Sequence, residues 1–457
     1  MAATECFVIL GAARQGTALA RFLVQRGARV ILTDARPESE LKDVMEQLQD
    51  LDIEWAAGGH PLSLLDRATA VCPSGGVPLT IPFLQEARAR GIRFTNDSQV
   101  FLEHAPCPVI GITGSAGKTT TTTLVGRMAQ AAEGQTLRKA WVGGNIGAPL
   151  IAMLDEMQAG DLAVMELSSF QLDIMARSPH VAGLLNITPN HLDRHGSMEA
   201  YAAAKANLLA YQMADDYAVL GRDDSMVMAL RAKTAAQVLT FGLTDLPNRE
   251  NGSFIRDESV WLRDAQGERA VLPLTDNLLP GLHNQRNVLA AAALAAAAGL
   301  PDEAIRTGVQ GFRGVPHRLE FVRTWRGADW INDSKATTPA AVVVALESIR
   351  RPVVLLAGGR DKHLPWDEFA AVAGRNAAHI VLFGEAAGLI RAALDAAGGK
   401  VKVSVCPGLE AAVQQAAQVL EHGWVALLSP GCTSFDEFKD YEERGERFKH
   451  WVLALEE

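Results

Sequence analysis

A short run of glycine, lysine and threonine near residue 115 has the composition of a phosphate-binding loop. The run is Gly114-Ser115-Ala116-Gly117-Lys118-Thr119-Thr120, after an apolar stretch and before a segment that we expect to be helical from Thr120. Glycines let backbone N–H groups face a polyphosphate, the lysine supplies a mobile cation, and the threonine hydroxyl can hold magnesium. Ile112 stands where the usual pattern has its first glycine, so the match is to the shorter Gly-x-x-Gly-Lys-Thr. Two interpretations stay open, a nucleoside triphosphate site and a strand-to-helix turn in which these residues only shape and cap the turn.

Glu166 could be the metal-binding partner of this loop. It ends an apolar, strand-like run, and the carboxyl ends of parallel strands meet at one edge of a sheet, where the phosphate loop would also lie. Magnesium prefers oxygen ligands and keeps several waters, so Glu166, the Thr119 hydroxyl and phosphate oxygens would be a sufficient set. A solvated acid at a strand end is the alternative.

His191 and Lys205 follow in the same part of the chain. His191 comes after a strand-like run, where a histidine often only caps a turn. Lys205 lies in a helix-like segment, residues 197–211, where an exposed, solvated lysine is the common case. The local sequence therefore leaves the role of both residues open.

The N-terminal segment predicts the opening of a doubly wound sheet. We expect a strand over residues 7–10, a helix over 17–26 and a strand over 29–33, with a glycine-containing turn after the first strand. That turn resembles the dinucleotide fingerprint, and Asp34 stands about where a ribose-binding acid would be.

Ala13 argues against NAD at this turn, because it replaces the glycine that lets a pyrophosphate approach the backbone. We expect another nucleotide instead, with its diphosphate at the start of the helix near Arg14 and Arg36. A plain helix–strand connection with solvated arginines is the alternative.

The alternation of strands and helices restarts twice, after prolines near residue 106 and after glycines near residue 314. After the second restart the pattern predicts a helix over 339–347 and strands over 329–331, 353–357, 379–383 and 425–428. We therefore predict an α/β protein of three domains. They are a Rossmann-like N-terminal domain (1–105), a central P-loop ATPase-type domain with a parallel sheet (106–314) and a C-terminal Rossmann-like domain (315–457).

Composition limits the class of protein. A chain of 457 residues is long enough for about three domains. Its net charge of −10 argues against generic nucleic-acid binding. Five scattered cysteines indicate a reducing, cytoplasmic setting. We expect neither an export signal nor a membrane anchor, since the chain starts without a basic leader and the alanine-rich run 289–300 is too short to span a bilayer.

Taken together, the motifs resemble those of the Mur ligase family. The phosphate loop is followed by Glu-Leu-Ser-Ser-Phe-Gln-Leu from Glu166, by Asn-x-x-x-x-His-Leu-Asp-Arg-His from Asn186, and by Lys205. Further matching blocks begin at Gly143, Leu282, Pro316 and Ile331, so the resemblance covers nearly the whole chain. The block 428–436 and the short N-terminal domain are most similar to the branch that adds D-glutamate to UDP-N-acetylmuramoyl-L-alanine.

The resemblance implies an ATP-dependent amide ligase of peptidoglycan precursor synthesis. The γ-phosphoryl group of ATP passes to a substrate carboxylate, and the acyl phosphate then accepts an amine. The catalytic residues implied are Lys118, Glu166, His191 and Lys205. The implied ligands of two magnesium ions are Thr119, Glu166, His191 and Lys205, the lysine as a carbamate. The implied ATP contacts are Gly114, Ser115, Ala116, Gly117, Lys118, Thr119, Thr120, Asn284, Asn287, Arg318, Asp333 and Lys335.

Substrate contacts follow from weaker matches. The implied contacts to the UDP-sugar are Arg14, Gln15, Arg36, Ser74, Asn145 and Ser168, with Arg14 and Gln15 placed in a loop. The implied D-glutamate pocket consists of Thr337, Lys362, Ser434 and Tyr441. A surface or capping role is the alternative for each. The sequence departs from the family pattern at Ala116, where asparagine is frequent, at Ser74-Gly75-Gly76, and at Tyr441. We expect a monomer without nucleic-acid or membrane partners.

Three other functions remain as alternatives. A related ligase could add a different amino acid or glutamate to a folate. A P-loop kinase or GTPase would share the loop, although the chain lacks the guanine-reading Asn-Lys-x-Asp pattern. A NAD-dependent dehydrogenase would use only the N-terminal turn.

Overall fold

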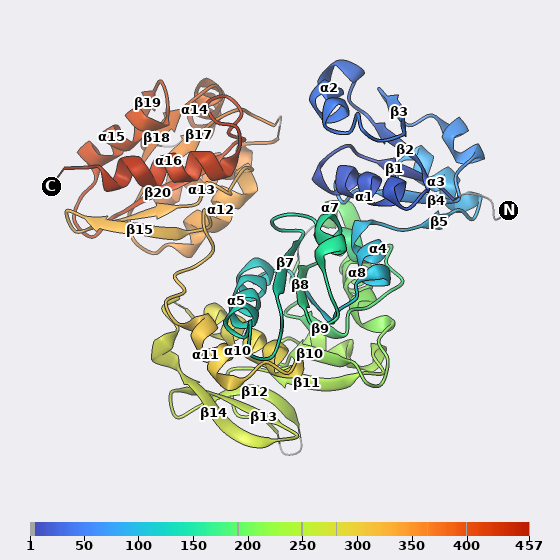
Figure 1. Ribbon diagram of the computed structural model, residues 1–457. Helices are drawn as coiled ribbons and strands as arrows, with labels where there is room; N and C mark the ends of the chain where they lie inside the picture. The colour runs from blue at the N-terminus through green and yellow to red at the C-terminus, as the bar shows by residue number, and fades with distance from the viewer. Residues whose placement is uncertain are drawn as a thin grey trace. The chain divides into compact units, whose positions relative to one another are not determined.

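The chain forms two compact units, Met1–Phe312 and Arg313–Glu457. The computed structural model describes residues 5–189, 192–247, 250–279, 281–362, 364–398 and 400–456, with the backbone alone at residues 192 and 193. Three sheets organise these residues, two in the first unit and one in the second (Figure 1). His191, one of the predicted site residues, lies outside the described residues.

The N-terminal sheet has five parallel strands in the order β3-β2-β1-β4-β5. Its elements are β1 (Cys6–Leu10), α1 (Arg14–Gln25), β2 (Arg29–Asp34), α2 (Glu38–Gln47), β3 (Ile53–Ala57), the 3-10 helix η1 (Leu62–Asp66), β4 (Ala70–Pro73), α3 (Pro82–Ala89), β5 (Arg93–Phe94) and α4 (Asp97–His104). The prediction that Arg14 and Gln15 lie in a loop is wrong, because α1 already begins at Arg14. Ala13 is its N-cap, in an extended conformation.

The central sheet has nine strands in the order β14-β13-β12-β11-β10-β9-β6-β8-β7. The pairs from β7 to β12 are parallel, and β12, β13 and β14 form an antiparallel extension. The first elements are β6 (Val109–Thr113), α5 (Lys118–Ala131), β7 (Ala140–Gly144), η2 (Leu150–Glu156), β8 (Leu162–Glu166), α6 (Ser169–Leu172), β9 (Val181–Leu184), α7 (Leu192–His195) and α8 (Met198–Ala210). They continue with β10 (Tyr217–Gly221), α9 (Ser225–Ala229), η3 (Arg231–Lys233), β11 (Gln237–Phe241), β12 (Asn251–Arg256), β13 (Ser259–Asp264), β14 (Gly267–Pro273), η4 (Leu274–Asp276), α10 (Leu282–Ala297) and α11 (Asp302–Val309).

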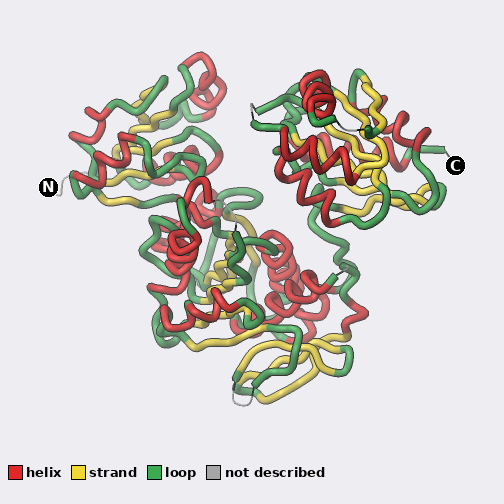
Figure 2. Tube along the Cα trace, turned by 180° about the vertical axis from the view of Figure 1, so that it is seen from behind, coloured by secondary structure: helices red, strands yellow, loops and turns green. Residues whose placement is uncertain are grey.

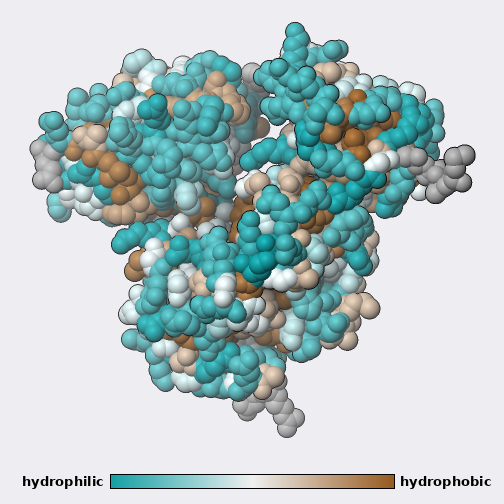
Figure 3. Space-filling model, viewed as in Figure 1, coloured by the Kyte–Doolittle hydropathy of each residue, from teal (hydrophilic) through white to brown (hydrophobic). Residues whose placement is uncertain are grey.

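Buried strands and an alanine-rich helix make up the interior of this sheet domain. Every residue of β6, β8 and β9 is buried, as expected for parallel strands that are covered on both faces. Helices flank the strands in the view from behind (Figure 2). Helix α10 is buried continuously from Asn287 to Ala295, so its apolar run serves the core. Among the described residues, no helix is long and apolar enough to cross a membrane. Hydrophilic residues cover most of the face shown in Figure 3.

The second unit contains a six-stranded sheet in the order β15-β16-β20-β17-β18-β19. Only β15 runs antiparallel to its neighbour among the described strands of this sheet. Its elements are β15 (Glu320–Trp325), β16 (Ala328–Asn332), α12 (Pro339–Ser348), β17 (Val353–Gly358), α13 (Asp367–Asn376), β18 (Ala377–Phe383), α14 (Ala387–Ala396), β19 (Lys402–Cys406), α15 (Leu409–Val419), β20 (Val425–Gly431) and α16 (Tyr441–Leu453). Apolar clusters pack on both faces of this sheet. The predicted α/β class with Rossmann-like sheets around a central P-loop domain is confirmed.

Candidate active site

The phosphate loop connects the end of β6 to the start of α5, which begins at Lys118, two residues earlier than predicted. Gly117 caps this helix with φ +83°, a conformation that L side chains rarely adopt. A Cβ at Gly117 would lie 2.3 Å from Asn287 Oδ1, so glycine is required for both reasons. The Lys118 Nζ donates to the carbonyls of Gly114 (2.9 Å) and Ser115 (3.3 Å). The loop thus presents its backbone and its lysine at the N-terminus of a 14-residue helix, which favours anions.

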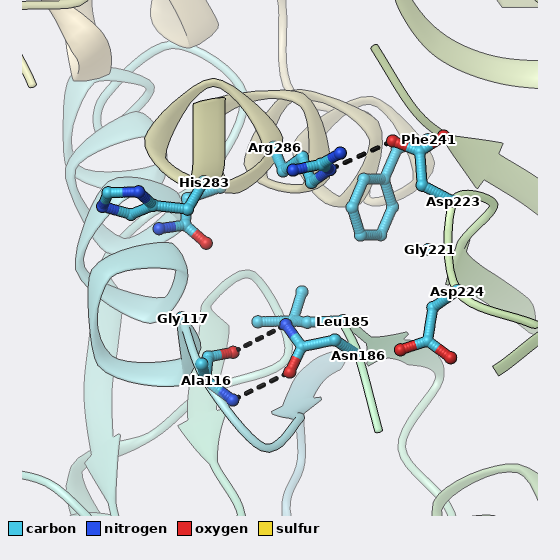
Figure 4. Close-up of a pocket in the computed structure, with 11 residues that line it drawn as sticks. Ala116, Gly117, Leu185, Asn186, Gly221, Asp223, Asp224, Phe241, His283 and Arg286 are labelled. Carbon is cyan, nitrogen blue, oxygen red and sulfur yellow. Dashed lines mark hydrogen bonds and ion pairs between the residues drawn. The ribbon is translucent and has the colours of Figure 1, made fainter. Parts of the chain in front are cut away.

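The Asn186 side chain braces the backbone of the phosphate loop at Ala116. Its Oδ1 accepts a hydrogen bond from the Ala116 N–H at 2.8 Å, and its Nδ2 donates to the Ala116 carbonyl at 3.0 Å. Figure 4 shows this pair of bonds below the cavity. Asn186 follows β9, which pairs with β6, so the sheet brings it to the loop across 70 residues of sequence. The loop conformation is therefore braced from a neighbouring strand.

Glu166 lies beside the phosphate loop at the end of β8. It is the last residue of β8 and pairs with Ile112, which lies one residue before the end of β6. The side chain is buried; its Oε1 accepts from Asn145 Nδ2 at 2.8 Å, whereas Oε2 is buried without a hydrogen-bond partner among the described residues. An orphaned carboxylate oxygen in the interior is costly unless a cation or a donor meets it. With the buried Thr119 on the adjacent helix, the residues present suit a hard cation such as Mg²⁺.

Lys205 is buried on α8 with 1% of its surface exposed. Its Nζ donates to the Gly114 carbonyl (3.0 Å) and to Thr113 Oγ1 (3.3 Å), and it lies 4.7 Å from the centre of the Tyr201 ring. Burial, with a smaller contribution from Lys118, lowers the pKa of Lys205 to about 6. The amine is therefore largely neutral at pH 7 and nucleophilic.

A cavity of about 350 Å³ opens next to the phosphate loop (Figure 4). Its walls come from the loop, from the residues after β9 and β10, and from α10. The lining residues are Ala116, Gly117, Leu185, Asn186, Gly221, Asp223, Asp224, Phe241, His283, Arg286 and Asn287. Asn287 donates to Asn284 Oδ1 at 3.1 Å, so the two predicted asparagines are adjacent. An apolar ring and a few polar groups beside a phosphate cradle suit a nucleoside.

The N-terminal sheet contributes a paired arginine at the ends of its strands. The Arg36 guanidinium forms two hydrogen bonds with Asp34, Nε to Oδ1 at 3.0 Å and Nη2 to Oδ2 at 2.9 Å. This guanidinium keeps the pKa of Asp34 well below its usual range. Asp34 Oδ2 also accepts the Ala12 N–H at 2.8 Å. The acid that could read a ribose is thus engaged by Arg36.

A second cavity, of about 100 Å³, lies between the N-terminal sheet and the central domain within the first unit. Its lining includes Ser74 from the end of β4 and Phe170, Arg194 and His195 from the central domain. The Arg194 guanidinium lies over the Phe170 ring at 4.6 Å, and the His195 ring stacks on that ring at 5.2 Å. Asn145 and Ser168, the other residues predicted to contact the UDP-sugar, flank the Glu166 strand end.

In the second unit the predicted residues gather where β16 and β20 end. Asp333 is 5% exposed; its Oδ2 accepts from Ser429 Oγ at 2.8 Å and its Oδ1 accepts the Leu319 N–H at 3.2 Å. Burial raises the pKa of Asp333 to about 6. The neighbouring Lys335 donates its N–H to the His317 carbonyl at 2.9 Å, next to Arg318.

The residues predicted for the amino acid lie in the same region. Lys362 Nζ donates to Thr337 Oγ1 at 3.2 Å, and burial lowers the pKa of Lys362. The Tyr441 ring lies 6.0 Å from Lys335 Nζ. Ser434 is buried, one residue after Thr433.

Comparison with known proteins shows what these features share. Three family models match in order along the chain, a MurD-like N-terminal domain of Mur ligases at residues 5–96, the Mur ligase middle domain at 112–295 and the Mur ligase glutamate ligase domain at 317–432. The UDP-N-acetylmuramoylalanine--D-glutamate ligase of Symbiobacterium thermophilum is 40% identical over 451 residues, 99% of this chain and 98% of that protein. The protein of the same name from Pelotomaculum thermopropionicum is 40% identical over 98% of this chain and 97% of its own.

The chain belongs to the Mur ligase family.

A solved structure agrees at the level of the fold. The ligase MurC from Thermotoga maritima superposes with a TM-score of 0.53 at 18% identity, covering 99% of this chain and all of that one. As a Mur ligase, the chain is an enzyme of ATP-dependent amide ligation in peptidoglycan synthesis. Membership decides against the kinase, GTPase and dehydrogenase alternatives.

Side-chain oxygens beside the phosphate loop could contribute to a metal site together with other ligands. No group of three His, Cys, Asp or Glu residues suited to a metal occurs in the described part of the chain. The donors that the structure does place, Glu166 and Thr119, are oxygen ligands beside a phosphate cradle. They suit an ion that phosphate and water complete.

The contacts of three residues of this Mur ligase could not be predicted from the sequence. Asn186 begins the Asn-x-x-x-x-His motif, but the motif does not indicate that its side chain binds the backbone of the phosphate loop. The Tyr201 hydroxyl shares a hydrogen bond with Ser115 Oγ at 3.0 Å, and its ring lies beside the Lys205 amine. The residues around Tyr201 in the sequence form no motif that would indicate these contacts. Arg444 is fully buried on α16, and its helical spacing with the buried Phe448 and Val452 was a signal that could have revealed it.

Proposed function

We propose that this Mur ligase uses ATP to join D-glutamate to UDP-N-acetylmuramoyl-L-alanine through an acyl phosphate. The observation that carries the proposal is 40% identity over 99% of the chain to a protein named for this reaction. The aligned region spans all three family-model matches, including the glutamate ligase domain at residues 317–432.

ATP binding is assigned to the loop and helix that lie beside the larger cavity. Backbone N–H groups of the loop and the Lys118 ammonium would hold the phosphates, and Asn284 and Asn287 would contact the nucleoside side. Arg318, Asp333 and Lys335 of the second unit are proposed as further nucleotide contacts. Positioning and neutralisation of phosphate charge account for most of the catalysis expected of phosphoryl transfer.

Thr119 and Glu166 are proposed to hold one Mg²⁺, and His191 with a carbamate on Lys205 to hold a second. Bound magnesium would neutralise the phosphates and the substrate carboxylate. The orphaned Oε2 of Glu166 supports the first assignment.

The carbamate is supported by the surroundings of Lys205. A neutral amine can attack CO₂, forming an N–C bond and losing one proton, whereas an ammonium cannot. The low pKa and the absence of a carboxylate partner among the described residues favour the neutral form. The product is an anionic oxygen ligand in place of a group that would repel a metal.

Substrate selection is assigned to two regions. Arg14, Gln15, Arg36, Ser74, Asn145 and Ser168 are proposed for the UDP-sugar. Thr337, Lys362, Ser434 and Tyr441 are proposed for D-glutamate, because a cation and hydroxyls suit two carboxylates. We also propose domain limits of 1–105, 106–314 and 315–457, a cytoplasmic location and a monomer.

A substrate panel tests the proposal directly. ADP formation is measured with UDP-N-acetylmuramoyl-L-alanine and, in turn, D-glutamate, L-glutamate, lysine or meso-diaminopimelate. We expect stimulation by D-glutamate alone. Stimulation by another member of the panel, with none by D-glutamate, would overturn the substrate assignment while leaving the ligase class intact.

A further inference from the structure

The start of α4 is polar and buried, which is unusual for a segment that joins two sheets. Asn96, Asp97, Ser98 and Gln99 are each 6% exposed or less. Buried polar side chains are tolerated when their hydrogen bonds are satisfied. Asn96 and Ser98 both bind Gln171 in the turn formed by Ser168 and helix α6, whereas Gln99 binds Ala176 just after that turn and Glu103 in α4.

Three side chains of α4 bind this turn and the chain just after it. Asn96 Nδ2 donates to the Gln171 carbonyl at 2.9 Å, while its Oδ1 accepts the Gln99 N–H at 2.8 Å and so caps α4. Ser98 Oγ accepts from Gln171 Nε2 at 2.8 Å. Gln99 Oε1 accepts the Ala176 N–H at 2.8 Å. The turn is held from one side at three points.

These contacts fix which way the Gln171 amide faces. The Ser168 N–H donates to Gln171 at 2.9 Å, and because a backbone N–H can only donate, the atom that receives it is Oε1. Nε2 must then face α4, where Ser98 Oγ receives one of its hydrogens. Both ends of the amide are therefore assigned by their partners.

The amide in turn fixes the proton of Ser168. The Ser168 hydroxyl donates to the same Oε1 at 2.9 Å and accepts the Gln171 N–H at 3.3 Å. A hydroxyl has one proton and two lone pairs, so one lone pair of Ser168 is left for a ligand. Ser168 is half-buried, and Phe170 of the same turn lines the smaller cavity.

We propose that Asn96 and Ser98 are positioning residues for the sugar nucleotide: they hold Gln171 so that Ser168 offers only a hydrogen-bond acceptor to the substrate. The matching group on the substrate is then a donor, an amide N–H or a hydroxyl. This inference rests on the proposed function, since it takes Ser168 as a substrate contact.

The test is a double-mutant cycle on binding of UDP-N-acetylmuramoyl-L-alanine, measured by calorimetry without ATP. Ser98→Ala should weaken binding about three- to tenfold, the size of one hydrogen bond. In a Ser168→Ala background the same change should weaken binding less than about twofold, because Ser98 affects the substrate only through the Ser168 hydroxyl. The KM for ATP should stay unchanged in Ser98→Ala.

Thr95→Val is the matched control. Thr95 is fully buried one residue before Asn96, and its hydroxyl has no hydrogen-bond partner among the described residues. This variant therefore removes a buried hydroxyl without touching Gln171 and should bind the sugar nucleotide like the wild type. Asn96→Ser is a second test variant: serine can still cap the helix but lacks the amide that donates to the Gln171 carbonyl, and it should weaken binding as Ser98→Ala does.

The outcomes separate this inference from the function. Equal binding by Ser98→Ala and Thr95→Val, or a Ser98→Ala effect that persists unchanged in Ser168→Ala, would refute the positioning role alone. A wild-type protein that does not bind this sugar nucleotide would refute the proposed function itself.

Discussion

Two buried cations, Lys205 in the central domain and Arg444 in the second unit, occupy their sites in different ways. Lys205 makes two hydrogen bonds, at 3.0 and 3.3 Å, and burial lowers its pKa to about 6. Arg444 makes four hydrogen bonds, to the Ser334 hydroxyl and to the carbonyls of Ser334, Cys432 and Thr433, at 2.9 to 3.1 Å. Its pKa is lowered only to about 10, so it stays charged.

The difference teaches which cation is set up for chemistry. The fork of Arg444 ties the segment that contains Asp333 and Lys335 to the segment that leads to Ser434, and four of its five N–H donors bind oxygens. Lys205 has fewer bonds and a neutral amine at pH 7. Arg444 holds two segments of its site together, whereas the amine of Lys205 is available for modification.

The largest effect is expected for Lys205→Ala. Losing the proposed oxygen ligand should reduce the rate of ADP formation by about 10²- to 10³-fold, the cost of removing one electrostatic contact to the reacting groups. Acetate or formate should restore part of the rate. Lys205→Arg, which replaces the neutral amine by a permanent cation and cannot form the carbamate, should be as inactive. Full activity of Lys205→Ala without added acetate or formate would contradict the proposed role of Lys205.

Arg444→Lys should cost stability. A lysine cannot reach all four acceptors, and unsatisfied buried carbonyls should lower the free energy of unfolding by about 3 kcal/mol. Denaturant unfolding, followed by tryptophan fluorescence, measures the loss. A variant as stable as the wild type would show that Arg444 is not the organising residue.

The pH dependence of stability should separate the two cations. An unfolded lysine has a pKa near 10.4, so between about pH 6 and 10 the unfolded state binds more protons than a folded state with neutral Lys205. Wild-type stability should therefore rise with pH, by at most about 1.4 kcal/mol per unit, and this slope should be missing in Lys205→Met. The measurement needs buffers free of CO₂.

Arg444→Met serves as the contrast in the same experiment. Since the folded pKa of Arg444 is about 10, its contribution changes only above that pH. The stability difference between Arg444→Met and the wild type should be constant from pH 6 to pH 9. Equal slopes for the two methionine variants would remove the distinction between the cations.

Asn186→Ala should have the smallest effect, because Asn186 braces the phosphate loop with two hydrogen bonds where Arg444 uses four. We expect the KM for ATP to rise about fivefold, equivalent to about 1 kcal/mol. The KM for D-glutamate should not change. Unchanged ATP kinetics would mean that the loop holds its shape alone.

Much of the fold and part of the site could be predicted because they depend on local order. Glycine, lysine and threonine at fixed spacing predict a phosphate loop, and Glu166 at a strand end is placed by the rule that parallel strands end together. Arg14 was misplaced because nothing in the residues around Ala13 marks the cap of α1, which has no side-chain hydrogen bond.

The remainder depends on contacts between distant segments. Helical spacing with Phe448 and Val452 indicates that Arg444 is buried, but its hydrogen-bond partners follow only from the positions of the 334 and 432 segments. The Ser98–Gln171 contact joins residues 73 positions apart. Side-chain partners of this kind follow from strand order and register, which a single sequence does not specify.

Asn186 has a consequence for how such enzymes are recognised and altered. A search that reads only residues 114–119 would miss the side chain that holds the backbone at Ala116, because that side chain lies 70 residues further along the chain. A change at residue 186 would therefore alter the phosphate loop without touching its sequence.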